Sequence, residues 1–467
     1  MNAGARRVER VYLLLLLLHT LAASFIWGIN TLFLLDAGLT NAQAFAANAF
    51  FTAGLVLFEV PTGVLADLRG RRLSYLLGTL TLALSTLLYL LMWRISAPFW
   101  AWALASALLG LGFTFFSGAV QAWLVDALRA HGYDGALDPV FARGEIVEGG
   151  AMLGGSVLGG YVAQMTNLGV PYILRAAALA LSFVTALLLM HDIGFAPKRD
   201  GGAVRQVKAV LQGAIQSGFV NRPVRWVMIA SAFTDGVAIY GFYAMQPYLL
   251  DLYGDPKAYG IAGLSAAIVG GAQIAGGLLV SRLSRVVPRR TTLLQVAVVA
   301  SGSTLLLIGL VPRFPVAVGL LVVWGLLFAT VTPVRQGYLN ELIPSEQRAT
   351  GLSFDSLMGS GGGVIVQPLL GKAADVWGYP ASYLCGATIQ LLASPFHLAG
   401  PTRAARSLTR AKGSRANPSA ARTSRSGARS QGTFFTAAVD SEHLVRSVLA
   451  KSSLITWQEK CPHGMDG

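Results

Sequence analysis

The sequence predicts an all-α polytopic membrane protein with twelve transmembrane helices in two six-helix bundles. Hydrophobic residues make up 54% of the chain and charged residues only 12%, with a mean hydropathy of +0.58. Ordinary soluble domains do not have such a composition. Apolar segments of about 20 residues, the length that crosses a bilayer, follow one another along the chain. A basic stretch interrupts them midway and separates two sets of six.

Each predicted span is an apolar run bounded by charged residues, Pro or Gly. The first span follows Arg6, Arg7 and Arg10 and resembles a signal peptide. Because its apolar run continues to Leu35, with no small-residue cleavage site before a soluble domain, we interpret it as a transmembrane helix. The twelve spans are 11–35, 44–66, 73–93, 98–127, 142–165, 171–191, 223–250, 259–281, 291–311, 314–340, 349–371 and 378–398.

These spans divide the chain into five parts. Residues 1–10 form a short N-terminus, 11–191 the first bundle, 192–222 a basic linker, 223–399 the second bundle and 400–467 a basic tail. Part of the linker has the pattern of an amphipathic helix at a membrane surface. The tail is rich in Arg, Ser, Ala and Gly, so we expect it to be disordered, either touching anionic lipid or having no specific role.

Lys and Arg are distributed unequally between the two sets of connections, and cytoplasmic loops are the ones that collect them. The connections opposite the N-terminus hold only Arg94, Lys257, Arg313 and Lys372. We therefore predict a multi-pass protein of the inner or plasma membrane with both termini in the cytoplasm. The cytoplasmic connections then hold the linker cluster and Arg69, Arg71, Arg72, Arg129, Arg143, Arg282, Arg285, Arg289, Arg290 and Arg348.

The stretch Gly63–Arg72, G-V-L-A-D-L-R-G-R-R, is a charged turn between the second and third spans. Charge and unpaired backbone are both costly in hydrocarbon, so we place this stretch in a short loop at a membrane face. A weaker copy stands at the same place in the second half, where Gly277 is followed by Ser281 and a run of arginines ending at Arg290. An acidic residue closes the fourth span of each half, Asp126 and Glu341. The two halves therefore resemble a degenerate repeat.

The chain resembles the major facilitator superfamily. Its loop motif, G-x-x-x-D-x-x-G-R-[RK], matches at Gly63, Asp67, Gly70, Arg71 and Arg72. The resemblance implies two six-helix bundles around a central cavity, with alternating access by rocking. It also implies a gate in which Asp67 faces the start of the eleventh span near Arg348–Gly351, and Arg71 or Arg72 pairs with Asp126. The alternative is that these charges only anchor the topology.

Four charged residues lie too deep in predicted spans to reach an interface: Glu59, Asp235, Arg335 and Asp355. Buried charges in a membrane mark functional sites, and an acid there could load and release a proton. An ion pair of Asp235 or Asp355 with Arg335 that only fixes packing is the alternative. We interpret Asp36, Glu145, Glu148 and Arg175 as residues near span ends that snorkel or cap.

Glycines are frequent in the fifth span, from Glu148 to Gly160. They resemble the antiporter motif of drug:proton antiporters, G-x-x-x-G-P-x-x-G-G, but Gly155 replaces the Pro and the spacing to Gly159 is one residue longer. Close helix packing is the simpler interpretation. Polar and aromatic residues that could line a cavity, or only pack, are Trp27, Asn30, Gln121, Trp123, Tyr240, Tyr243, Gln246, Gln336 and Tyr338.

We therefore expect a secondary transporter that exports a small organic molecule by proton antiport. Uptake by symport or uniport is the alternative, and a non-transporting membrane sensor or scaffold is the alternative from another class. No P-loop, H-E-x-x-H or suitably placed G-x-S-x-G indicates an enzyme. The two cysteines form no metal pattern, and the net charge of +14 lies in loops and tail. The expected partners are a small solute, protons and lipid, without metal, cofactor, nucleic acid or a second subunit.

Overall fold

The computed structural model describes residues 1–195, 222–287, 289–343 and 348–398, and the regular elements within these ranges are all α-helices. Breaks at Gly28–Ile29 and at Phe115–Gly118 divide the first and fourth predicted spans into two helices each. The helices of the first half are α1 (Ala3–Trp27), α2 (Asn30–Asp36), α3 (Asn41–Arg69), α4 (Arg71–Ile95), α5 (Phe99–Thr114), α6 (Ala119–Ala130), α7 (Asp138–Met165) and α8 (Gly169–Leu189).

The second half is divided differently, because α10 and α13 are continuous and α14 merges two spans. α14 changes direction at Gly378, whose φ of 80° and ψ of 169° are not helical, and its two arms correspond to the eleventh and twelfth predicted spans. The helices of the second half are α10 (Arg222–Tyr253), α11 (Tyr259–Val286), α12 (Arg290–Leu310), α13 (Phe314–Leu342) and α14 (Arg348–Leu398).

The predicted fold class is confirmed. Among the described residues, ten helical segments are long and apolar enough to cross a membrane, and they coincide with the first ten predicted spans. Leu84 and Leu91 on α4 and Leu188 on α8 are exposed, as outward-facing side chains in lipid would be. The helix ends differ from the prediction, because α1 already begins at Ala3. Most of the linker and the tail from 400 onward lie outside the described residues.

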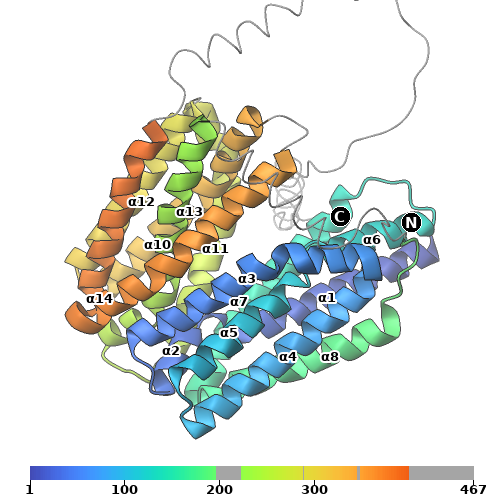
Figure 1. Ribbon diagram of the computed structural model, residues 1–467, viewed down its shortest axis with the longest axis horizontal. Helices are drawn as coiled ribbons and strands as arrows, with labels where there is room; N and C mark the ends of the chain where they lie inside the picture. The colour runs from blue at the N-terminus through green and yellow to red at the C-terminus, as the bar shows by residue number, and fades with distance from the viewer. Residues whose placement is uncertain (196–221, 288, 344–347, 399–467) are drawn as a thin grey trace, which may run out of the picture. The chain divides into compact units, whose positions relative to one another are not determined.

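Each half has its own packed interior. In the first half α1 packs against α7 and α8, and α4 packs against α8, as Figure 1 shows. Phe33, stacked on Tyr172 with ring centroids 4.0 Å apart, belongs to this interior. In the second half α10 packs against α14, and α12 against α13. The halves meet where α3 contacts α14 and where α7 contacts α11.

The connections between helices alternate between two ends of the bundles. One end, called the basic side here, carries Gly70, residues 131–137 and 190–195, and the two residues Val287 and Arg289. The other end, called the opposite side, carries residues 37–40, 96–98, 166–168, 254–258 and 311–313, together with Gly378.

Glycines allow the two halves to touch backbone to backbone. A Cβ added to Gly28 or to Gly160 would lie 2.9 Å from the Cα of Gly263, so side chains there would force the helices apart. Gly155 and Gly159 face α1 in the same way. Close packing therefore accounts for these three glycines of the fifth span.

Candidate functional site

The charged stretch Gly63–Arg72 is almost entirely helical. α3 runs through Arg69 and α4 begins at Arg71, so Gly70 alone reverses the chain. Its φ of 106° and ψ of 154° suit glycine, and a Cβ there would collide with the Asp192 carboxylate. The loop is therefore much shorter than the gap between predicted spans 44–66 and 73–93.

The arginines of this turn have partners other than the expected one. Arg71 Nη1 lies 2.5 Å from Asp67 Oδ1, across the turn. Arg72 donates its backbone N–H to Asp192 Oδ1 at 2.9 Å and a guanidinium N–H to the Leu187 carbonyl at 2.6 Å. Within the described residues no ion pair joins Asp126 to either arginine. The expected pairing with Asp126 is thus absent from this conformation, because the tight turn lets Arg71 reach back to α3.

The second half contains the pairing that was expected of the first. Arg290, the first residue of α12, lies 3.0 Å from Glu341 near the end of α13. Both side chains are well exposed, at 43% and 60%. The degenerate copy of the motif therefore contains an ion pair between α12 and α13 although its aspartate position is Ser281.

Asp235 on α10, Arg335 on α13 and Asp355 on α14 form one buried ion cluster, called the triad here. Arg335 donates to both oxygens of Asp235, at 2.9 and 2.7 Å, and its Nε lies 3.1 Å from Asp355 Oδ2. The side chains of Arg335 and Asp355 are 5% and 4% exposed. Arg335 and Asp355 each stand two turns, about 10 Å, from the basic-side end of their helices. The sequence selected all three residues, and the structure brings them together.

The triad contains the ion pairs that one of the two interpretations predicted. Arg335 makes the structural ion pairs, and a guanidinium bound through two N–H groups fixes its partner's geometry. Two carboxylates nevertheless face one guanidinium, and Asp355 Oδ1 is buried without a hydrogen-bond partner among the residues that the structure describes. With both acids ionised the cluster carries one excess negative charge, which is costly away from water.

Glu59, the fourth selected residue, lies apart from the triad on α3. It is exposed, and its Oε1 accepts a hydrogen bond from Ser117 Oγ at 2.5 Å, at the break between α5 and α6. Glu59 is therefore linked to the fourth span of its own half.

Arg175 on α8 was misjudged from the sequence. It does not snorkel to an interface, because it is 1% exposed. Its Nε donates to Thr86 Oγ1 and its Nη1 to the Ala22 carbonyl, both at 3.0 Å, while Nη2 is buried with no hydrogen-bond partner in the described part of the chain. Its position six residues into α8 suggested a span end, but a side chain of that length can turn inward as easily as outward.

The hydrogen bonds between the halves, within the described residues, lie toward the opposite side. Gln246 on α10 accepts from the Thr31 N–H at 3.0 Å and donates to the Trp27 carbonyl at 2.9 Å, so its amide bridges the break between α1 and α2. Asp375 accepts from the backbone N–H groups of Asn41 and Ala42, at 2.8 and 2.9 Å. A carboxylate at a helix N-terminus is favourable, and this one ties α14 to α3.

Most of the expected cavity-lining residues pack or bridge instead. Trp27 stacks on Phe242 with ring centroids 4.4 Å apart, and Tyr240 donates to Ser382. Asn30 donates to Asn48 and accepts from Tyr172. Gln121 does line a cavity. The role of Gln246 could not be found from sequence, since it depends on a break in a helix of the other half.

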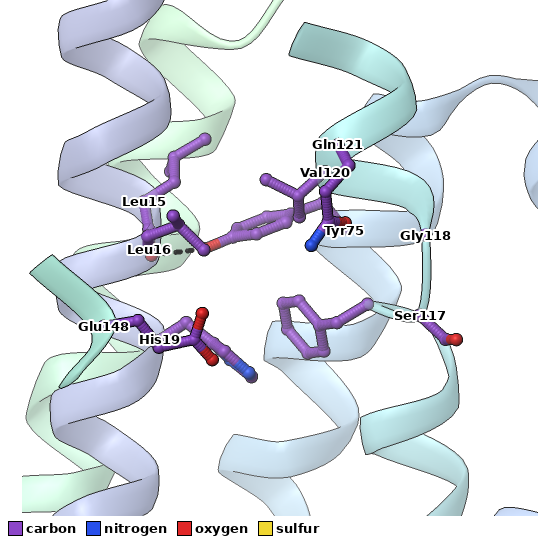
Figure 2. A pocket seen from close by; sticks show the side chains of 10 residues that line it. Leu15, Leu16, His19, Tyr75, Ser117, Gly118, Val120, Gln121 and Glu148 are labelled. Carbon is purple, nitrogen blue, oxygen red and sulfur yellow. Dashed lines mark hydrogen bonds between the residues drawn. The ribbon is translucent and has the colours of Figure 1, made fainter. Parts of the chain in front are cut away.

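A cavity of about 320 Å³ lies within the first half, between α1, α4, α6 and α7 (Figure 2). Figure 2 shows His19 and Glu148 on one wall, with Tyr75, Val120 and Gln121 on the other. His19 was missed, although a histidine inside the apolar run of the first span was a visible signal. The cavity is lined by Leu15, Leu16, His19, Tyr75, Phe116, Ser117, Gly118, Val120, Gln121 and Glu148.

Comparison with solved structures places the fold among transporters. The crystal structure of the nucleoside transporter NupG matches with a TM-score of 0.69 at 13% identity, covering 85% of this chain and 99% of that chain. A POT family transporter in complex with 5-aminolevulinic acid matches with a TM-score of 0.64 at 14% identity, covering 84% and 95%. At such identities the likeness concerns the fold alone. A search of curated proteins found no match.

The sequence itself matches a family profile over most of its length. The profile of the Major Facilitator Superfamily matches residues 12–366 and 258–456. These ranges include the Gly70 turn, the triad and Arg175. The chain is a multi-span membrane protein and belongs to the major facilitator superfamily of transporters.

Proposed function

We propose that this chain is a secondary active transporter that exports a small organic molecule by proton antiport, with the triad as its proton site. The main support for this proton site is the net charge of the triad. Two carboxylates facing one guanidinium leave a negative charge that a single proton removes, and Asp355 Oδ1 has the free lone pair to hold it. Protonation would also weaken the hold of Asp355 on Arg335 and so free α14 from α13.

Alternating access would involve the two bundles, 11–191 and 223–399, as rocking units. The bridges made by Gln246 and Asp375 close the opposite side, which the predicted orientation places outside the cell. We assign this conformation to an inward-open state. In the outward-open state Arg71 would leave Asp67 for Asp126, and the charged turn would then act as the gate predicted from its sequence.

Proton coupling is tested in proteoliposomes holding the full chain and a trapped pH-sensitive dye. A solute panel of toxic cations, nucleosides, dipeptides and organic acids is added, and proton movement is recorded for the wild type, Asp235→Asn, Asp355→Asn and Glu59→Gln. Glu341→Gln, which changes only an exposed ion pair, is the control. We expect solute-driven proton flux to be lost in at least one triad variant. Unchanged coupling in all three acid variants would contradict the proton role.

Comparing cells with and without the protein, for drug susceptibility and for metabolite uptake, decides between export and the alternative of uptake by symport or uniport. Uptake is retained as the second candidate because proteins of this fold include a nucleoside transporter and peptide transporters. A protein that moves no solute of the panel, with or without a proton gradient, would be a sensor or scaffold.

The assigned conformation has its own test. The Asn41→Cys, Asp375→Cys double variant places two thiols at the closed end, where the backbone N of residue 41 now lies 2.8 Å from the Asp375 carboxylate. We expect oxidation to stop transport and a reducing agent to restore it, with the two single variants as controls. Full transport by the cross-linked protein would show that this end does not open.

A further inference from the structure

Arg175 carries a positive charge that nothing in the described part of the chain neutralises. Its guanidinium makes no ion pair there and donates only to a hydroxyl and a carbonyl. Nη2 is buried without a partner. A buried, unpaired charge is strongly unfavourable, so a ligand that supplies the counter-charge would be bound favourably here.

The surroundings of Arg175 are aromatic. The guanidinium lies over the Phe113 ring, 5.7 Å from its centroid. Tyr89, Tyr172 and Tyr243 are close enough to interact with its charge, and Tyr243 comes from α10 in the other half. A guanidinium is planar and pairs with carboxylates through two N–H groups, while aromatic walls favour an apolar or aromatic body. These features suit an organic acid at the junction of the halves.

His19 and the Phe113 ring lie between Arg175 and the cavity of Figure 2, which His19 lines. His19 lines the cavity, stacks on Phe116 with centroids 4.0 Å apart and meets Phe113 edge-on at 5.9 Å. Phe113 is the ring beneath Arg175, and the Ala22 carbonyl that Arg175 binds is one helical turn from His19. The cavity volume of about 320 Å³ falls in the range of small-molecule sites, about 300–1,000 Å³. His19 Nδ1 is itself a buried polar atom with no hydrogen-bond partner within the described ranges.

We infer that the first half holds a binding site for an organic carboxylate, with Arg175 as the anchor of its acidic group and the His19 cavity as its entrance. This deepens the proposed function by naming the class of solute. The two halves then hold buried excess charges of opposite sign, the Arg175 cation in the first half and the anionic triad in the second. A carboxylate would neutralise the one and a proton the other.

Removing the charge of Glu148 should change carboxylate affinity in the direction opposite to removing the charge of Arg175. Glu148 lines the same cavity from α7 and is exposed to it, so its carboxylate repels an incoming anion. Removing the Glu148 charge should strengthen binding of a carboxylate. Removing the Arg175 charge should weaken carboxylate binding only.

The test measures thermal unfolding of the purified full chain in detergent while a ligand is titrated. Five probes contain a phenyl ring and differ in charge: the acids benzoate and phenylacetate, the neutral amides benzamide and phenylacetamide, and the cation benzylamine. Hexanoate is added as an aliphatic acid. The variants are Arg175→Gln, Arg175→Lys and Glu148→Gln. Arg94→Gln, at an exposed arginine near the end of α4, is the matched control.

We expect at least one carboxylate, and none of the neutral or cationic probes, to raise the unfolding midpoint of the wild type. Arg175→Gln should weaken that binding by about tenfold or more, the loss typical of a charged hydrogen bond. Arg175→Lys should restore part of it and Glu148→Gln should tighten it, while Arg94→Gln leaves it unchanged. If Arg175→Gln fails to fold, the direction of the Glu148→Gln effect still decides.

The inference is overturned if no carboxylate binds, if the amides bind as well as the acids, or if Glu148→Gln weakens carboxylate binding. Binding in detergent needs no gradient, so this test and the flux test fail separately. Proton-coupled flux of neutral solutes without carboxylate binding would remove this inference and leave the transporter. Carboxylate binding without flux would support the binding site and contradict the proposed transport function.

Discussion

Two buried arginines stand in opposite electrostatic states in this protein. Arg335 is held by two aspartates, whereas Arg175 is equally buried and has a hydroxyl and a carbonyl as its only hydrogen-bond partners in the described structure. The first arginine is over-compensated and the second is not compensated at all. The burial of a charged side chain therefore says little about function by itself. The absence of a counter-ion beside that side chain is the more direct indication of a binding function.

The largest effect is expected from Arg335→Met. It leaves Asp235 and Asp355 buried together without a cation, and breaking a buried ion pair costs about 3–5 kcal/mol of folding free energy. We expect a marked drop in the thermal unfolding midpoint of the detergent-purified protein. A midpoint close to that of the wild type would mean that the aspartates are neutral in the folded protein, and the contrast between the two arginines would disappear.

The triple variant Arg335→Met, Asp235→Asn, Asp355→Asn should recover most of this loss. Replacing every member of a buried ion cluster removes the unpaired charge that makes single replacements costly. The recovered midpoint, compared with those of the single variants in a thermodynamic cycle, measures the coupling within the triad. Additive single effects would show that the three side chains do not act as a unit.

Arg175→Met should have the opposite sign to Arg335→Met. Methionine removes an unpaired buried charge and fills similar space, at the expense of the hydrogen bonds to Thr86 and Ala22. We expect unchanged or higher stability without ligand, by up to about 1–4 kcal/mol, as for other buried charges replaced by apolar residues. A loss as large as that of Arg335→Met would assign Arg175 a structural role.

The smallest effect is expected from Glu341→Gln. It breaks the Arg290–Glu341 pair, in which both side chains are well exposed, and exposed ion pairs contribute at most about 1 kcal/mol. The unfolding midpoint should stay within experimental error and be insensitive to salt. A clear drop in the midpoint would show that the basic side of the second half depends on this contact. The effects of the buried pairs would then have to be compared with that larger effect of an exposed pair.

The fold and part of the site follow from the sequence for simple reasons. Span length and composition fix the helices, because hydrocarbon allows few alternatives. The triad residues were found because charged residues in apolar runs are conspicuous, but which aspartate pairs with Arg335 depends on the packing of α10, α13 and α14. Arg175 was misjudged because depth along a helix does not give side-chain direction. Asp375 and Gln246 bind backbone groups of the other half, and a sequence contains no trace of such contacts.

The meeting of Gly28, Gly160 and Gly263 has a mechanical consequence. The helices meet at these glycines through backbone atoms, without side chains that interdigitate. One helix can therefore tilt against the other without the two having to separate first. A rocking motion would use this spot as its fulcrum, with the long helices as lever arms. Atoms there would move least, and displacement would grow with distance along α7 and α11. A small tilt near these glycines would thus become a wide opening at the far ends of the helices.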